Sequence, residues 1–541
     1  MTAFLSTWVG FDSEAHLAVT VGGDVAEHVS ALLPTQVEDH VASRLGAGDP
    51  TLWGPAAEAD AASHLGWTAL HETARRHLEP LEELFVDLRG EGVNRVVLVG
   101  MGGATLAAQV ICATYGVPLV TLDSTSPDRV RAALAGDLRS TVMVVASKSG
   151  STIETEALRA AVESAFTEAG IDPRRRMVVV TDAGSPLEAA ARAKGCRGLF
   201  LEDPSVGGRF SALSAFGLVP AALAGVPVLE VLDEAAAVAE SLEEDDRANP
   251  ALVLGAALAG RRRFLVVSDH GSGIVGLGDW IEHLVGGATG KGGKGVVPVL
   301  AAPQAPDLGQ PDAIDCRLVS LSADDDAEGP VLTVSGTLGA LLLLWEHAVA
   351  VTARLLGVDP FDEPDVESSR TAARDLLESD SPGPAPAFVD DGIEAYGTLA
   401  ELSAVTTVHE ALQTLEECLG SDGYLAVLAY LDREANPSLP GARRALAQRL
   451  ARPVTFGWGP RYLHSTGQLH KGGPASGVFL LLTADFSEDL AIPGLPFTFG
   501  RLIHAQAAGD ARSLSEAGRP VLRLNLTDRT QVARVAALLE G

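Results

Sequence analysis

The residues most suited to chemistry lie in one short segment, 147–155, which reads Ser-Lys-Ser-Gly-Ser-Thr-Ile-Glu-Thr. It directly follows the apolar run 141–146, so we expect a buried parallel strand, a hydroxyl- and glycine-rich turn and then a helix. Such a turn directs backbone N–H groups, hydroxyls and an ammonium group to one point, and the helix start adds about half a positive charge there. The segment therefore predicts a phosphate-binding site.

The overall charge of the chain makes this turn more informative. The 541 residues include 71 acidic and 40 basic side chains, which gives a net charge of −31 at pH 7. Nucleic acids and anionic membrane surfaces repel so acidic a chain, and we expect neither as a partner. A phosphate group on a small molecule needs a locally positive site in such a protein, and the turn supplies one.

A second glycine-rich turn, Gly-Met-Gly-Gly-Ala-Thr at 100–105, follows the predicted strand 96–100. It would let a ligand approach the backbone above the carboxyl ends of the strands. A dinucleotide-binding fingerprint needs a third glycine where Thr105 stands, although Asp123, after the next predicted strand, is placed like a ribose-binding acid. The turn is either a tight strand-to-helix connection or part of an NAD site, which the imperfect fingerprint disfavours.

Two later glycine-rich segments contain basic residues. In Val-Gly-Gly-Arg-Phe-Ser at 206–211, paired glycines precede Arg209, whose guanidinium could lie beside a bound anion or on the surface at a domain junction. In the segment 280–295, six glycines and two lysines fall within the last ten residues. This composition predicts a mobile loop whose lysines could reach a sugar phosphate, or a plain flexible connector.

A dense polar turn, His-Ser-Thr-Gly-Gln-Leu-His-Lys-Gly-Gly, occupies 464–473. Histidine is the side chain that most readily exchanges a proton near neutral pH. Either His464 or His470 is a candidate general acid or base, and either could instead be a hydrogen-bonded loop histidine.

The elements that must position these residues follow an α/β plan of alternating strands and helices. The first predicted sheet is doubly wound and parallel, with strands at 96–100, 118–122, 141–146, 177–181 and 199–202. A second alternating region has strands at 264–268, 296–300 and 317–320, followed by a long apolar helix at 339–356. A third unit has strands at 424–430, 454–457, 478–482 and 521–526, and helices at 442–450, 498–508 and 531–540.

This pattern divides the chain into predicted units. They are a mostly helical N-terminal extension (1–90), two doubly wound domains (91–245 and 246–376), a Pro- and Ser-rich linker (377–390) and a smaller C-terminal α/β unit (391–541). The apolar stretch 338–345 is too short to span a bilayer, and we find no signal peptide. The four scattered cysteines predict reduced thiols in a cytoplasmic protein and no zinc site.

The order of these motifs resembles the glucose-6-phosphate isomerase (phosphoglucose isomerase) family, which is built on two sugar-isomerase (SIS) domains. The resemblance begins near residue 90 and is closest to a bacterial branch whose isomerase part is also found fused to transaldolase. It implies SIS-type folds for 91–245 and 246–376. It also implies interconversion of glucose 6-phosphate and fructose 6-phosphate without metal or organic cofactor, in a cytoplasmic homodimer.

The resemblance also implies roles for individual residues. The sugar phosphate would bind the two turns, through Gly102, Gly103, Thr105, Ser147, Lys148, Ser149, Ser151 and Thr152. Glu154 would lie near the sugar hydroxyls, and Arg209 would stabilise a cis-enediolate oxyanion. Either His470 or His464 would assist ring opening.

Three positions depart from the family pattern. The family's Glu-Ser-Thr-Gly-Lys, whose glutamate is the base, aligns with Gly-Ala-Thr-Gly-Lys, so Gly287 stands at the base position. Arg370 replaces an acid/base lysine and is always protonated. Ala104 replaces a serine, for which Thr105 could substitute.

These departures leave alternatives open. The protein could be a working isomerase that uses another base, such as His283, Glu154 or Glu346. It could instead be a sugar-phosphate-binding relative with impaired catalysis. A NAD-linked dehydrogenase is a third, more distant interpretation.

Overall fold

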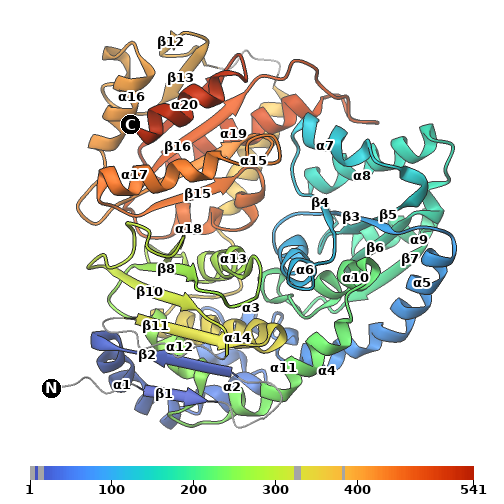
Figure 1. Cartoon of the computed structure of the whole chain (residues 1–541), viewed down its shortest axis with the longest axis vertical. Helices are drawn as coiled ribbons and strands as arrows, with labels where there is room; N and C mark the ends of the chain where they lie inside the picture. The colour runs from blue at the N-terminus through green and yellow to red at the C-terminus, as the bar shows by residue number, and fades with distance from the viewer. Residues whose placement is uncertain (1–5, 10–16, 151, 322–330, 380–383) are drawn as a thin grey trace.

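The chain folds around three β-sheets (Figure 1). The computed structural model describes residues 6–9, 17–150, 152–321, 331–379 and 384–541. Each sheet contains parallel strands flanked by helices, so the predicted α/β class is confirmed.

The first sheet is the predicted five-stranded parallel sheet, in the order β4-β3-β5-β6-β7. Its strands are β3 (Arg95–Val99), β4 (Val120–Leu122), β5 (Thr141–Ala146), β6 (Met177–Asp182) and β7 (Gly198–Glu202). Alternate side chains of β5 enter two different cores: Met143 and Val145 pack on one face, and Val142 and Val144 on the other. Both faces are therefore covered, as the uninterrupted apolar runs require.

The helices around the first sheet precede its strands, connect them or follow the last of them. They are α5 (Leu78–Gly90), α6 (Gly103–Thr114), α7 (Pro127–Leu134), α8 (Ile153–Glu168), α9 (Pro186–Lys194) and α10 (Ala215–Ala224). Helices α6 and α8 each begin just after a strand ends, at the two glycine-containing turns that the sequence singles out. The carboxyl edge of this sheet therefore carries both turns.

The second sheet has six strands in the order β1-β2-β11-β10-β8-β9. The strands are β1 (Ser6–Val9), β2 (Leu17–Val21), β8 (Phe264–Asp269), β9 (Val297–Ala301), β10 (Ala313–Leu318) and β11 (Val331–Gly336). Strands β8 to β11 are parallel, whereas β2 pairs antiparallel with β11. The N-terminal extension thus completes a sheet whose other strands come from the middle of the chain. The sequence pattern predicted neither this pairing nor β11.

The helices of the N-terminal extension and of the second region cover this sheet and its edges. They are α1 (Gly23–Glu38), α2 (Val41–Gly46), α3 (Glu58–Ala61), α4 (Leu70–Thr73), α11 (Val228–Glu243), α12 (Pro250–Leu258), α13 (Leu277–Thr289) and α14 (Leu338–Leu356).

The third sheet also has six strands, in the order β12-β13-β17-β16-β14-β15. The strands are β12 (Phe388–Asp390), β13 (Ile393–Gly397), β14 (Tyr424–Tyr430), β15 (Val454–Trp458), β16 (Gly477–Ala484) and β17 (Val521–Leu526). The helices of this part are α15 (Val366–Glu378), α16 (Val408–Glu417), α17 (Ala442–Leu450), α18 (Gly467–Gly472), α19 (Phe499–Glu516) and α20 (Gln531–Glu540).

The hydrophobic cores extend across the predicted domain boundaries. One core joins Val266 of β8 and Val299 of β9 to Leu428 of β14 and Leu481 of β16. Another joins the first sheet to Phe499 of α19. Because the units share buried side chains, the position of each functional loop depends on more than its own sheet. The domain limits themselves remain predictions.

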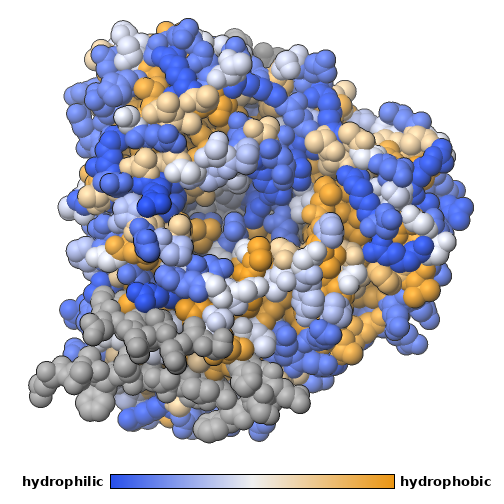
Figure 2. All heavy atoms as spheres, viewed as in Figure 1, coloured by the Kyte–Doolittle hydropathy of each residue, from blue (hydrophilic) through white to orange (hydrophobic). Residues whose placement is uncertain are grey.

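Helix α14 is a core helix. Within the described ranges it is the one helix long and apolar enough to cross a membrane. The prediction that this stretch is too short to span a bilayer considered 338–345 alone and is wrong for the whole helix. Its side chains from Leu338 to Ala353 are all buried inside the protein. The backbone carbonyl of Ala350 accepts a hydrogen bond from the indole of Trp53, at 3.0 Å. Figure 2 shows hydrophilic and hydrophobic residues mixed on the face in view, with hydrophobic residues gathered on its right half.

Candidate active site

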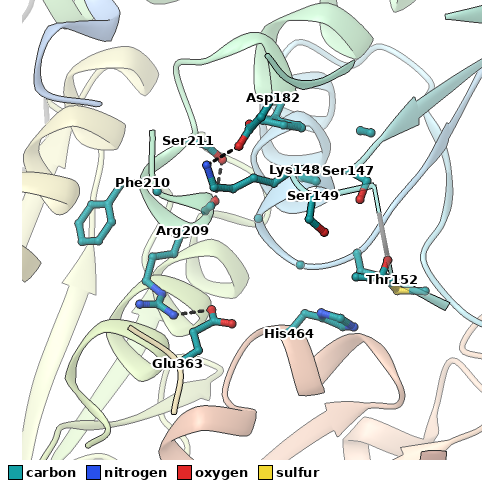
Figure 3. Close-up of a pocket in the computed structure, with 18 of the residues that line it drawn as sticks. Ser147, Lys148, Ser149, Thr152, Asp182, Arg209, Phe210, Ser211, Glu363 and His464 are labelled. Carbon is teal, nitrogen blue, oxygen red and sulfur yellow. Dashed lines mark hydrogen bonds and ion pairs between the residues drawn. The ribbon is translucent and has the colours of Figure 1, made fainter. Parts of the chain in front are cut away.

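A cavity of about 550 Å³ lies at the carboxyl edge of the first sheet (Figure 3). Its volume is in the range of small-molecule binding sites. The wall contains residues 101–104, 146–149, 207–211 and 361–363, and single side chains from more distant segments complete it. Both predicted turns therefore open into the same space.

The phosphate turn (147–152) forms one wall of the cavity. Ser147, Ser149 and Thr152 line it, and α8 begins at the next residue, Ile153. The Ser147 hydroxyl accepts the Gly150 N–H at 3.1 Å, and the Thr152 hydroxyl donates to Thr155 at 2.7 Å. Ser151 lies outside the described residues. The hydroxyls and the positive end of α8 suit an anionic oxygen cluster.

The glycine turn before α6 adds a second helix start to the cavity. Gly102 and Gly103 line the cavity, and Gly102 has φ of 59°, a conformation that favours glycine. A Cβ on Gly103 would lie 2.2 Å from the carbonyl oxygen of Gly208, so only glycine fits there. Thr105 does not line the cavity: it is fully buried, and its hydroxyl donates to Gly102 at 3.1 Å. Its predicted contact with phosphate is therefore not supported.

Lys148 is already paired with an acid. Its ammonium lies 2.6 Å from Asp182 and donates to the carbonyl oxygen of Pro204 at 2.8 Å (Figure 3). Burial raises the pKa of Asp182 to about 6, although Lys148 opposes this shift. Lys148 lines the cavity, so its contact with phosphate stays a prediction, but Asp182 neutralises part of its charge.

Arg209 lies on the opposite side of the cavity and is almost fully buried. Its Nη1 donates to the carbonyl oxygens of Pro360, at 2.6 Å, and Asp362, at 3.3 Å. Its Nη2 is bonded to the carboxylate of Glu363, as Figure 3 shows. Arg209 is therefore no surface arginine: its planar group is fixed in the cavity wall.

Glu363 links two arginines. Its second oxygen lies 3.9 Å from Nη2 of Arg370, on α15. Burial would raise the pKa of Glu363, but the positive charges of Arg209, Arg370 and His464 outweigh it and hold the pKa below its ordinary value. Arg209, Glu363, Arg370 and His464 form what we call the charged wall.

His464 is the C-terminal histidine that reaches the cavity. Its Nδ1 lies 3.5 Å from Arg370, and its Nε2 lies 3.3 Å from Glu154. Glu154 also accepts a hydrogen bond from Gln506 at 2.8 Å. Burial opposes ionisation of Glu154, but the hydrogen bond and charge of His464 keep its pKa lowered. Glu154 lines a smaller adjoining cavity of about 170 Å³ and not the main one.

His470 lies in the protein core and not at the cavity. Its Nδ1 is 2.9 Å from the hydroxyl of Tyr424, and the rings of Tyr462 and Phe479 pack around it. Burial and the neighbouring cations lower its pKa to about 3. Of the two predicted histidines, only His464 is placed to meet a ligand.

The segment 280–295 is no mobile loop. Helix α13 continues to Thr289, and Lys291 is buried, with its ammonium 2.7 Å from Asp362. A Cβ on Gly290 would lie 2.4 Å from the Cα of Leu469, so the glycines permit close packing. Gly287 lies within this helix and does not line the cavity.

Several cavity residues were missed from the sequence. Asp60 and His64, from the N-terminal extension, line the cavity, and the His64 ring stacks on Phe361 with centroids 5.9 Å apart. No local motif marks this pair. Phe361 and Glu363 come shortly before Arg370 in the sequence, but only Arg370 was predicted to belong to the site. His283, by contrast, was named from the sequence as an alternative base; it lines the cavity, and neither of its ring nitrogens has a hydrogen-bond partner among the described residues.

The described residues match a dinucleotide site and a metal site poorly. Asp123, which a dinucleotide site would need, is buried between Arg433, at 3.1 Å, and Arg461, at 3.4 Å. Across the described part of the chain, no group of three His, Cys, Asp or Glu side chains is arranged for a metal ion.

The fold and site define an α/β protein with a cavity at the carboxyl edge of a parallel sheet, lined by hydroxyl side chains, two helix starts and a buried arginine. No family model matches the chain. A probable glucose-6-phosphate isomerase of Natronomonas pharaonis is 30% identical over 351 residues, which cover 55% of this chain and 82% of that protein. A glucose-6-phosphate isomerase of Rubrobacter xylanophilus is 30% identical over 372 residues, 55% of this chain and 85% of that protein.

Solved structures resemble the fold as well. A hypothetical protein from Thermus thermophilus aligns with a TM-score of 0.53 and 25% identity, over 66% of this chain and 97% of that one. A glucose-6-phosphate isomerase from Chlamydia trachomatis aligns with a TM-score of 0.52 and 19% identity, over 66% and 88%. The chain belongs to the glucose-6-phosphate isomerase family.

Proposed function

We propose that the protein interconverts glucose 6-phosphate and fructose 6-phosphate. The observation that carries this proposal is the placement of a hydroxyl-rich helix start and a buried arginine on two walls of one cavity. The relatives named glucose-6-phosphate isomerase support the substrate class.

The phosphate turn would bind the sugar phosphate. Ser147, Ser149 and Thr152 would donate hydrogen bonds to the phosphate oxygens, and the α8 N-terminus would add its partial positive charge. Gly103 would allow Gly208, the neighbour of Arg209, to pack closely against the start of α6. Lys148 would contribute at longer range, because it remains bound to Asp182.

The charged wall would carry the proton chemistry. His464, held between Glu154 and Arg370, would move a proton to and from the ring oxygen during ring opening. Removal of the C2 proton from the open-chain aldose then gives a cis-enediolate. Arg209 would stabilise this oxyanion, because its guanidinium is already fixed in place and needs no reorganisation.

A binding-only relative is the second candidate, and two residues favour it. Gly287 and Arg370 stand where the family carries a base and an acid/base lysine. Under that interpretation the protein would bind fructose 6-phosphate without converting it. Replacing both residues, Gly287→Glu with Arg370→Lys, would then raise turnover.

A coupled assay of the purified protein tests the main proposal. Fructose 6-phosphate is the substrate, and glucose 6-phosphate is followed through its oxidation by a dehydrogenase. We expect turnover in the natural protein and a loss of about 10²-fold or more in Arg209→Ala. Arg512→Ala, on an exposed arginine paired with Glu516, is the control.

Calorimetry with fructose 6-phosphate separates the remaining outcomes. Binding without turnover would favour the impaired relative. Neither binding nor turnover would contradict both candidates. Turnover that survives Arg209→Ala would show that the cavity described here is not the active site.

We further propose a cytoplasmic homodimer, which rests on the family resemblance. Light scattering on the eluting protein should give about twice the chain mass of 56.0 kDa. A monomer mass would contradict the dimer.

A further inference from the structure

Position 287 faces Arg209. A Cβ built on Gly287 would lie 2.9 Å from Nε of Arg209 and 3.6 Å from its central carbon. Because 2.9 Å is too close for a real Cβ contact, a glutamate at this position would make Arg209 shift, and it would then hold its carboxylate beside the guanidinium, from α13. In this chain the glycine removes that carboxylate, and with it the base that the family pattern carries.

Glu363 brings a carboxylate to the same guanidinium from another segment. It precedes α15, one oxygen is bonded to Nη2 of Arg209, and the side chain is 41% exposed where it lines the cavity. The group is ionised at neutral pH, because the surrounding cations hold its pKa below the ordinary value. An ionised carboxylate therefore lies in the cavity, in contact with the arginine assigned to the oxyanion.

The other carboxylates on the described cavity wall are each committed elsewhere. Asp182 pairs with Lys148, Asp362 with Lys291 at 2.7 Å, and Asp60 with His64 at 3.0 Å. None of these three pairs includes Arg209. Glu363 alone in this set contacts it through a side-chain oxygen.

The bases suggested by the sequence are less well placed. Glu154 does not line the main cavity, and Glu346 lies fully buried in α14, where its carboxylate accepts the Ala212 N–H at 3.2 Å. His283 does line the cavity, but burial and Arg209 lower its pKa to about 3. Protonating His283 would create a second buried cation beside Arg209, which is unfavourable.

Protonation of Glu363, by contrast, adds no cation to the charged wall. As the carboxylate takes up a proton it loses its negative charge, and the enediolate gains one. Arg209 therefore faces one negative charge before and after the step. The guanidinium can stabilise both states without a change in the net charge of the wall.

We propose that Glu363 is the general base of the isomerisation and replaces, from the segment before α15, the carboxylate absent at position 287. The proposal rests on the proposed function. The Glu363 carboxylate takes the proton from C2 of the open-chain aldose. The C–H electron pair forms the C1=C2 double bond, and the carbonyl π pair moves to O1. Glu363 then returns the proton to C1, a proton passes from O2 to O1, and the ketose forms with the carboxylate regenerated.

The test compares Glu363→Gln with Glu367→Gln. Glutamine is nearly the same size and keeps an oxygen that accepts from Arg209, but it cannot take up a proton. Glu367 also pairs with Arg370, at 3.4 Å, yet it does not line the main cavity. We expect Glu363→Gln to lower kcat by about 10²–10⁴-fold with little change in KM, and Glu367→Gln to leave kcat nearly unchanged.

Incorporation of solvent deuterium into the sugar phosphate and the melting temperature are measured for the same variants. Deuterium exchange should fall together with kcat in Glu363→Gln while the melting temperature is kept. If kcat survives in Glu363→Gln, or only KM rises, Glu363 is not the base although the isomerase proposal stands. If the natural protein itself shows neither turnover nor exchange, the proposed function fails and the assignment of the base fails with it.

Discussion

The phosphate turn and the charged wall face each other across one cavity but are built differently. The phosphate turn comes from one stretch of chain between β5 and α8, and its hydroxyls keep the family pattern. The charged wall comes from three regions: Arg209 lies near α10, Glu363 and Arg370 lie around α15, and His464 precedes α18. The wall to which we assign phosphate binding is built from one local segment, whereas the wall to which we assign proton transfer is assembled from distant segments.

This difference has a physical basis. A phosphate cradle depends on backbone geometry and a helix start, which neighbouring residues determine together. A base has only to bring one carboxylate within reach of a carbon atom, and any segment that lines the cavity can supply it. Loss of the acid at position 287 is therefore compatible with activity if Glu363 serves.

After Glu363 and Arg209, the next largest effect on kcat is expected at His464, and it separates the two histidines. His464→Asn should lower kcat by about 10²-fold, because it removes the proton donor of the charged wall. Steady-state kinetics with fructose 6-phosphate measures it, and His504→Asn, which pairs with Asp485 away from the cavity, is the control. An undiminished kcat would remove His464 from the ring-opening step.

His470 should instead affect stability and its pH dependence. Its pKa is about 3 in the folded protein and about 6.5 when unfolded, so folding requires the neutral ring. The contribution of the neutral ring to the free energy of unfolding is fully present above pH 6.5. It is lost as the pH falls from 6.5 toward 3, at up to about 1.4 kcal/mol per pH unit.

Denaturant unfolding at several pH values measures this loss, and His470→Gln should flatten its slope in that window. The same variant should change kcat by less than about threefold, since His470 makes no contact with the cavity. A large fall in kcat with unchanged stability would reverse the roles given to the two histidines.

Moving the carboxylate from position 363 to position 287 tests whether a carboxylate at either position can serve as the base. In the Glu363→Gln background, Gly287→Glu should raise kcat about tenfold, because the new side chain starts in contact with Arg209. Gly287→Gln in the same background matches its size without the charge. Equal kcat values for the two double variants would show that a carboxylate at Arg209 is not what the reaction lacks.

The phosphate turn should respond in KM more than in kcat. Ser147→Ala removes one hydroxyl from the anion site and should raise KM about tenfold, with kcat nearly kept. Ser164→Ala, farther along α8, is the control, since its hydroxyl donates only to Glu168 at 2.8 Å. A fall in kcat without a rise in KM would place Ser147 in the chemical step.

The smallest effect concerns the paired lysine. Asp182→Asn removes the negative partner of Lys148, so a bound phosphate should feel more of the ammonium charge and KM should fall about threefold. Asp172→Asn, on an exposed acid paired with Arg174, is the control. An unchanged KM would indicate that Lys148 lies too far from the phosphate to matter.

Predictions from local sequence patterns were confirmed where neighbouring residues determine the local structure. The apolar run 141–146 followed by hydroxyls and glycine specifies β5, the turn and the start of α8, and these lie where predicted. Arg209 was also found from its own motif. By contrast, the glycines of 280–295 were interpreted as flexibility, because the close approach of Leu469 cannot be read from that segment.

The sequence by itself determined the α/β plan, the phosphate turn and the family, because each is encoded in contiguous residues and their periodicity. Only the tertiary structure decided that β1 and β2 complete the second sheet, that Lys148 is bound to Asp182, and that His464 and not His470 reaches the cavity. It also placed Glu363 on Arg209, the same guanidinium that position 287 faces. Such pairings depend on how distant segments pack, and no short stretch of sequence contains both partners.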